Sequence, residues 1–235
     1  MRKIIVLFTA LALLTIVGGG MVSAADSPLL GKIIALDAGH GGTSLGAQYP
    51  AGCADDGDTL DCLVFEKDVN LSVVYALKDK LEANGALVVL TRKGDETLGL
   101  KERSDIATVE CKALAGRNCD VFLAVHHNGN YDATHDGTLT IYNGGGNNKR
   151  LAIFMHDALV SGLGLKDEGY LSGGYGSTIF GNFTQALTEA YYITNTDEVN
   201  AYLAGTKTQQ EVDAQIAGLA NYFASQTGGK GGKPR

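Results

Sequence analysis

Two short segments that each contain a histidine carry the most chemical information in this sequence. Residues 36–42 read LDAGHGG and place His40 among glycines, and residues 122–130 read FLAVHHNGN and contain His126 and His127. In each segment an apolar run typical of a buried strand comes just before the histidine. Because sites in open α/β sheets assemble at the carboxyl ends of the strands, the two segments predict a metal site at one sheet edge, and so a hydrolase.

The histidines differ in how strongly their surroundings point to a ligand. The glycines beside His40 leave its imidazole exposed and let backbone and ligand approach closely, although a loop histidine that caps a helix would fit as well. Neighbouring residues on a strand face opposite ways, so only one of His126 and His127 is expected to join the site. Either of them could instead be satisfied in the core. Asn128 follows, and its amide could orient a ligand.

Two carboxylates are candidates for the rest of the site. Glu66 opens a predicted helix at the same sheet edge, a position that is favourable with the helix dipole in any case. Glu189 ends the apolar run ALTE, where a carboxylate is costly unless it is paired or functional, so it is a candidate general base. Two histidines, one carboxylate and an open position make a catalytic zinc site. His135 and His156 lack such a context and are expected at the surface.

Predicted strands alternate with predicted helices, which is typical of an α/β domain with a largely parallel sheet. The segments 32–36, 86–91, 121–126, 139–142 and 186–189 are expected as strands, and 66–84, 100–112, 148–163 and 208–226 as helices. The glycine-rich stretch 167–184 gives no clear assignment.

The first residues predict export. Residues 1–24 have a basic start, an apolar run over 4–17 and a small-residue cleavage site, as in a secretory signal peptide. The alternative is an uncleaved membrane anchor, but the apolar run is shorter than the roughly 20 residues that a span requires. We expect the catalytic domain over 25–227, a flexible tail over 228–235, and a location in the periplasm or outside the cell at the wall.

The net charge and the cysteines indicate which partners and which compartment fit this protein. The net charge of −7 makes nucleic acid or an anionic membrane a poor partner, and we expect a monomer with no stable membrane span after cleavage. The four cysteines allow three pairings. Export favours two local disulfides, Cys53–Cys62 and Cys111–Cys119. A four-cysteine zinc site is the rival, but the closely spaced cysteine pairs that such a site uses are absent from the sequence.

Six segments of the chain together resemble the zinc-dependent N-acetylmuramoyl-L-alanine amidases of the amidase type 3 family, which are peptidoglycan hydrolases. The segments are IIALDAGHGG (33–42), EKDVNL (66–71), ALVVLTR (86–92), LKERSDIA (100–107), FLAVHHN (122–128) and ALTEAYYITN (186–195), in the family's order. The resemblance implies a single domain with a twisted central sheet, helices on both faces and one zinc ion.

The resemblance also implies a role for each candidate residue. It assigns the metal ligands to His40, Glu66 and His126, and the catalytic glutamate to Glu189. The implied reaction is cleavage of the amide between the lactyl group of N-acetylmuramic acid and L-alanine. In it Glu189 acts as general base and then passes the proton to the leaving nitrogen.

The chain departs from the family pattern at several places. His127 stands where the family usually has a small residue, so it is not assigned as a ligand; it could line the substrate cleft with Asn128 or face away. The stretch 43–62 is longer than usual and is interpreted as an inserted loop beside the site, which could alter substrate choice. The segment QALT before Glu189 is less apolar than in the family.

The sequence contains no repeat-type wall-binding module, so we expect affinity for peptidoglycan to come from the domain itself, an activator or a wall-binding partner. Two other functions fit the same residues. One is a zinc peptidase or amidase that acts on another exported substrate, and the other is a non-catalytic wall-binding protein of the same fold.

Overall fold

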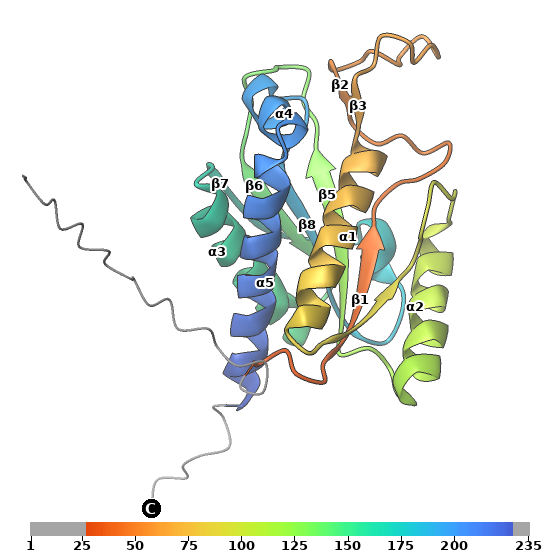
Figure 1. The fold of residues 1–235 in the computed structure, drawn as a ribbon, viewed down its shortest axis with the longest axis vertical. Coiled ribbons are helices and arrows are strands. Elements are labelled where there is room, and N and C mark those ends of the chain that lie inside the picture. The colour runs from red at the N-terminus through yellow and green to blue at the C-terminus, as the bar shows by residue number, and fades with distance from the viewer. Residues whose placement is uncertain (1–26, 228–235) are drawn as a thin grey trace, which may run out of the picture.

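A six-stranded sheet in the order β4-β1-β5-β8-β6-β7 forms the centre of the molecule (Figure 1). The computed structural model describes residues 27–227, so the predicted signal peptide and tail lie outside the described residues. The strands are β1 (Ile33–Ala38), β4 (Leu87–Leu90), β5 (Val121–Asn128), β6 (Thr138–Tyr142), β7 (Asp167–Ser172) and β8 (Thr184–Tyr192). Only the β6–β8 pairing is antiparallel, which confirms the mostly parallel sheet.

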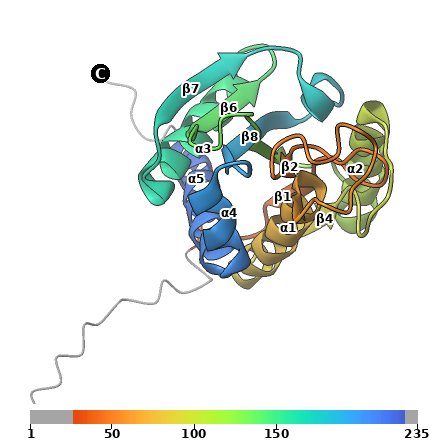
Figure 2. The same cartoon turned by 90° about the horizontal axis from the view of Figure 1, so that it is seen from above.

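Helices cover both faces of this sheet. Three helices, α1 (Glu66–Ala83), α3 (Asn147–Leu163) and α5 (Thr206–Thr227), pack on one face (Figure 2). The other face carries α2 (Leu100–Ala115) and the short 3-10 helix η2 (Gly176–Ile179), while α4 (Thr196–Leu203) follows β8. The predicted fold class is therefore confirmed. None of the helices within 27–227 is long and apolar enough to cross a membrane.

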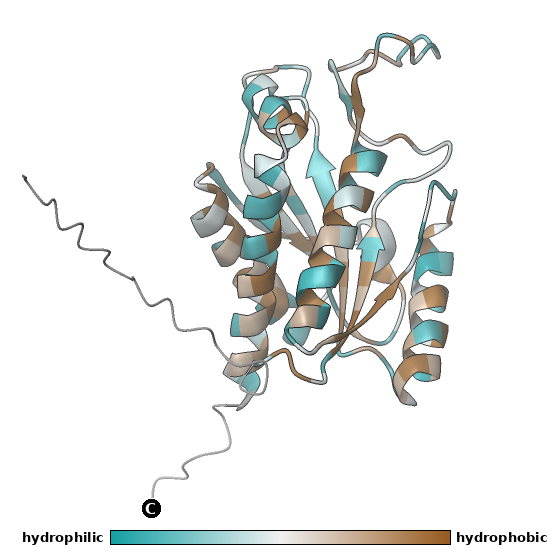
Figure 3. Ribbon diagram, in the orientation of Figure 1, coloured by the Kyte–Doolittle hydropathy of each residue, from teal (hydrophilic) through white to brown (hydrophobic). Residues whose placement is uncertain are grey.

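The strand β5 shows why these runs are apolar at every position. Val121, Leu123 and Val125 pack under α1 and α5, whereas Phe122 and Ala124 face α2. Successive side chains point to opposite faces, so a strand that is buried on both must be apolar throughout. The run ends where the sheet edge becomes polar, and Figure 3 shows the tips of β1 and β5 coloured as hydrophilic.

The glycine-rich stretch and the last strand differ most from the expected elements. The unassigned segment 167–184 contains the edge strand β7 and η2. β8 has nine residues instead of the predicted four. Thr184 and Gln185 already pair with the start of β5, and residues 190–192 continue the strand after Glu189 through a β-bulge opposite β5. The expectation that His156 lies at the surface is wrong. It is buried on the inner side of α3, where its Nε2 finds a partner in Asp167 Oδ1 at 2.8 Å.

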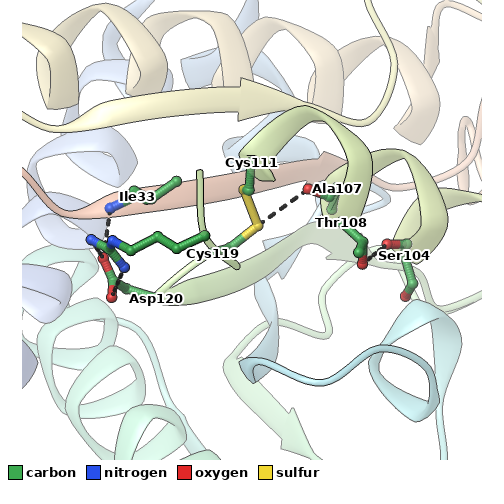
Figure 4. Close-up of a disulfide and its surroundings, with 8 residues drawn as sticks. Ile33, Ser104, Ala107, Thr108, Cys111, Cys119 and Asp120 are labelled. Atoms are coloured by element: carbon green, nitrogen blue, oxygen red, sulfur yellow. Dashed lines mark hydrogen bonds and ion pairs between the residues drawn. A yellow bond between two sulfur atoms is a disulfide. The ribbon is translucent and has the colours of Figure 1, made fainter. Parts of the chain in front are cut away.

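Two local disulfides are present, with the predicted pairing. Cys111, on α2, is bonded to Cys119, which precedes β5 (Figure 4). Cys53 and Cys62 close the inserted loop, whose base is a small ladder of β2 (Gln48–Tyr49) and β3 (Val64–Phe65). Because β3 leads directly into α1, this loop stands at the same end of the molecule as the tips of β1 and β5 (Figure 1).

Candidate metal site

His40, Glu66 and His126 meet at the carboxyl edge of the sheet. They come from the loop after β1, the first residue of α1 and the end of β5. Their potential ligand atoms all lie within 4.8 Å of one another. His40 Nε2 is 3.0 Å from Glu66 Oε2, and His126 Nδ1 is 3.0 Å from Glu66 Oε1. The structure therefore brings together the three residues that the sequence predicts as metal ligands.

The Glu66 carboxylate is buried and held at both oxygens. Besides the two imidazoles, Oε2 accepts from the Ala47 backbone N–H at 2.9 Å, and Oε1 accepts from Asn70 Nδ2 at 3.1 Å and the His127 backbone N–H at 3.2 Å. Burial alone would raise the pKa of Glu66. Hydrogen bonds and positive charge from His126 and His40 outweigh that effect and hold its pKa well below the usual range, so the group stays ionised.

Two glycines create the space for these side chains. A Cβ on Gly39 would stand 2.2 Å from the His126 ring, and a Cβ on Gly46 would stand 2.4 Å from Glu66 Oε2. His40 itself adopts a φ of 60°, a left-handed conformation that is uncommon for a residue with a side chain. Such strain persists only where surrounding contacts over-determine it, and it is common at functional sites.

The donor set fits a small divalent cation such as zinc. Two imidazole nitrogens and one ionised carboxylate oxygen converge from separate elements, which is the three-ligand composition of catalytic zinc sites. His40 Nδ1 lies 2.9 Å from Ser44 Oγ, so this contact orients the ring and turns Nε2 toward Glu66. These residues could therefore hold the ion that the sequence predicts.

Glu189 lies beside this centre. It pairs in register with His126 across β5 and β8, so the two side chains leave the sheet on the same face. Its Oε2 is buried and has no hydrogen-bond partner within the part of the chain that the structure describes. Burial, together with the negative charge of Glu66, raises the pKa of Glu189 well above its usual value. A buried carboxyl oxygen without a partner is costly to stability and often marks chemistry.

A pocket opens in front of the two histidines. It measures about 200 Å³, and His40, Ser44, His126, Arg103 and Ser177 are among its lining residues. A second pocket of about 270 Å³ lies between the inserted loop and the turn after β5, and Gln48, Gly52, Asp55, Asn130 and Tyr131 contribute to it. Ala47 belongs to this second pocket and also hydrogen-bonds Glu66, so the pocket wall is attached directly to the candidate metal site.

The two residues considered for the substrate cleft have different positions. His127 points to the opposite face of the sheet from His126 and is buried against α1 and α5. Asn128 ends β5, and its side chain accepts from the Gly129 backbone N–H at 3.0 Å.

A buried cluster that the sequence analysis missed supports the His40 loop. Asp37 and Arg103 form an ion pair of 2.9 Å, and Asp37 also accepts from Ser177 Oγ at 2.6 Å. Arg103 donates to the carbonyl oxygens of Ala38 and His40 at 2.7 and 2.6 Å. An aspartate inside the apolar run IIALDA is the one sequence signal that could have indicated this buried pair.

Comparison with known proteins agrees with this geometry. Residues 34–221 match the family model described as N-acetylmuramoyl-L-alanine amidase. The uncharacterized protein YqiI of Bacillus subtilis (strain 168) is 32% identical over 202 residues, which cover 85% of this chain and 88% of YqiI. The N-acetylmuramoyl-L-alanine amidase LytC of the same strain is 29% identical over 200 residues, which cover 84% of this chain and 36% of LytC.

The fold is also similar to solved structures. The catalytic domain of CwlV, an N-acetylmuramoyl-L-alanine amidase from Bacillus (Paenibacillus) polymyxa var. colistinus, superposes with a TM-score of 0.69 at 25% identity. The superposition covers 82% of this chain and 98% of that domain. With the family match extending over most of the sequence, the chain belongs to the N-acetylmuramoyl-L-alanine amidase family of peptidoglycan hydrolases.

Proposed function

We propose that this amidase cleaves the bond between N-acetylmuramic acid and L-alanine with one zinc ion, held by His40, Glu66 and His126, and with Glu189 as general base. The observation that carries the proposal is the pairing of the three-donor cluster with a carboxyl on the adjacent strand whose buried Oε2 has no hydrogen-bond partner among residues 27–227. A bound zinc ion would supply a Lewis acid that lowers the pKa of a water molecule to near neutrality.

Glu189 is suited to move the proton in this reaction. No hydrogen bond within residues 27–227 competes for its Oε2, and its raised pKa brings the carboxyl nearer to the pH at which a general base works best. It would take a proton from the attacking water and then deliver it to the leaving L-alanine nitrogen. The same carboxyl serves both steps because the proton is returned within one turnover.

Other contacts hold the His40 loop in place, and two pockets leave space for substrate. Ser44 orients the His40 ring, and Arg103 holds the backbone of the His40 loop from the other side. The pocket in front of His40 and His126 would admit the scissile amide, and the pocket behind Ala47 would contact a further part of the peptidoglycan. We propose that the inserted loop of residues 43–62 affects substrate choice through this second pocket.

Export to the periplasm or the extracellular wall completes the proposal. A peptidoglycan substrate lies outside the cytoplasmic membrane, and the two disulfides favour an oxidising compartment. We also propose an activator or a wall-binding protein as a partner.

Product analysis tests the proposed function. The chain from residue 25 onward is incubated with purified peptidoglycan, with and without a zinc chelator, and the released products are identified by mass spectrometry. Stem peptides with a new L-alanine amino terminus, lost on chelation and restored by zinc, are expected. Cleavage at another amide would indicate a different specificity, and zinc binding without any release would point to another substrate or to a required activator.

A further inference from the structure

We propose that His127 and Glu211 are positioning residues that orient the metal ligand Glu66 through Asn70 and thereby set the affinity of the metal site. The inference rests on the proposed function, in which Glu66 binds the ion. It gives a role to the histidine that stands beside the ligand His126 but faces away from the cleft.

A series of hydrogen-bonded side chains connects α5 with the Glu66 carboxylate. Glu211 Oε2 lies 2.9 Å from His127 Nε2, His127 Nδ1 lies 2.7 Å from Asn70 Oδ1, and Asn70 Nδ2 lies 3.1 Å from Glu66 Oε1. All four side chains are buried. Water therefore does not compete for these contacts, and each one constrains the next.

The partners fix the direction of each hydrogen bond. Asn70 Nδ2 faces two acceptors, Glu66 Oε1 and the Gly39 carbonyl oxygen, both at 3.1 Å. The amide cannot be flipped without placing two acceptors face to face, so its Oδ1 points to His127. His127 Nδ1 must then carry the proton that it donates to Asn70. At the other side of the ring, Nε2 lies within hydrogen-bond distance of Glu211 Oε2.

His127 holds Glu66 in two separable ways. Its backbone N–H donates directly to Glu66 Oε1, and its ring acts through Asn70 on the same oxygen. A side-chain substitution leaves the backbone contact in place and removes only the ring's contribution. Partners of this kind, which orient a metal ligand, change metal affinity by roughly 10- to 100-fold when they are lost.

Glu211, at the α5 end of this series of hydrogen bonds, is also held in place by a neighbouring side chain. Gln215, one helical turn after Glu211, donates to Glu211 Oε1 at 3.2 Å and to Thr188 Oγ1 at 3.1 Å. The Tyr191 ring packs edge-on against the His127 ring, with 4.4 Å between the ring centroids. The β-bulge in β8 lies between Glu189 and Tyr192, so it accommodates Tyr191 in this position. The contacts with Asn70, Glu211 and Tyr191 thus restrict rotation of the His127 imidazole.

Two substitutions of His127 separate positioning from mere packing. The amide nitrogen of Asn stands about where imidazole Nδ1 does, and that of Gln stands about where Nε2 does. His127→Asn keeps the donor to Asn70, whereas His127→Gln keeps the contact to Glu211 and loses the one to Asn70. His156→Gln is the matched control, because His156 is also buried beside a carboxylate but has no contact with Glu66.

The measurement is the Zn²⁺ dissociation constant of the purified protein, obtained by competition with a chelating dye, together with the visible spectrum of the Co²⁺-loaded protein. We expect His127→Gln to weaken Zn²⁺ binding by about 10-fold or more and to shift the Co²⁺ spectrum. We expect His156→Gln to stay within about threefold of the unaltered protein. His127→Asn keeps the donor to Asn70 but loses the contact with Glu211, so we expect it to weaken Zn²⁺ binding several-fold, less than His127→Gln does.

Several outcomes would overturn the inference. Unchanged Zn²⁺ affinity in His127→Gln, or an equal loss in the Asn and Gln variants, would show that the ring only fills space. Should His127→Gln fail to fold, Glu211→Gln carries the test, since it keeps the size of the side chain, and it should weaken Zn²⁺ binding several-fold; unchanged affinity there would again contradict us.

The proposed function fails in a different way. An unaltered protein that binds Zn²⁺ but leaves peptidoglycan intact would point to another substrate or to a required activator, while the comparison among variants would still decide the role of His127. An unaltered protein that binds no Zn²⁺ would overturn both.

Discussion

At the scale of single residues, Glu189 offers the sharpest test of the reaction. We expect Glu189→Gln to lower turnover of peptidoglycan by about 10²- to 10⁴-fold, because the amide cannot accept the proton from water. The substitution removes a carboxyl whose buried Oε2 has no hydrogen-bond partner within residues 27–227 and which is repelled by the charge of Glu66, so the folded state should be as stable as before or more so. Turnover, zinc content and thermal unfolding are measured together, and near-normal turnover would contradict the general-base role.

A second prediction tests whether His126 is a zinc ligand. We expect His126→Ala to lose bound zinc, because one of the three donors around the site disappears. Metal content after dialysis against buffer that contains a trace of free zinc is the measurement. Full zinc occupancy in this variant would show that His126 is not a ligand.

These residues differ in how far the sequence could predict them. His40 and His126 follow apolar runs that end at one sheet edge, so local pattern was enough to bring them together. Glu211 is 84 residues from His127 and lies within a helix whose periodicity marks it only as a polar position. Its role depends on how α5 packs on β5, and that is a tertiary property with no local signal.

At the scale of elements, the inserted loop and α2 provide a matched pair of disulfides. Removing Cys53–Cys62 by a double alanine substitution should raise KM for peptidoglycan with little change in kcat, because the loop lines the pocket behind Ala47. Each bridge closes a short loop and should stabilise the fold by about 2–4 kcal/mol. The Cys111–Cys119 double alanine is the control, and it should lower stability without changing KM. An equal rise of KM in both would refute a role of the loop in substrate binding.

The start of β1 is tied to the turn before β5 by a charged group. Asp120 Oδ2 accepts from the Ile33 backbone N–H at 2.8 Å (Figure 4). The same oxygen also accepts from Arg117 Nη2 at 2.8 Å. Burial raises the pKa of Asp120, but the hydrogen bonds from Arg117 and Ile33 outweigh it and lower the pKa overall. The ionised group therefore adds stability above its unfolded pKa of about 3.9, and that stability is lost as pH falls through the lower folded pKa.

Asp120→Asn should accordingly cost about 1 kcal/mol of unfolding free energy at pH 7. The difference from the unaltered protein should shrink as pH falls below about 4. Urea unfolding at a series of pH values measures both quantities. A difference that is constant with pH would mean that the carboxylate charge does not stabilise the start of β1.

Elements were predicted well where burial leaves a regular pattern. β1 and β5 are apolar on both faces, and α1 has apolar residues at helical spacing, so each was found within a few residues of its bounds. β7 was not found, because it is an edge strand with the sequence DEGYLS and four of its six residues are exposed. β7 is a strand because it pairs with β6, and its own composition does not favour a strand.

At the scale of the whole molecule, the candidate metal site joins three elements that are far apart in the sequence. His40 follows β1, Glu66 begins α1 and His126 ends β5, so an ion bound there would link them and couple to global stability. At a free zinc concentration of 100 times Kd, the folded state should gain about 2.7 kcal/mol. For a domain of this size that corresponds to a rise in Tm of roughly 5–10 °C.

Thermal unfolding with zinc and with a chelator measures this coupling. The unaltered protein should unfold at a higher temperature with zinc, and Glu189→Gln should show the same shift, because Glu189 is not among the three donors. His126→Ala should show none. If zinc raised Tm equally in His126→Ala and in the unaltered protein, the ion would be bound elsewhere, and the link between this sheet edge and the stability of the molecule would be refuted.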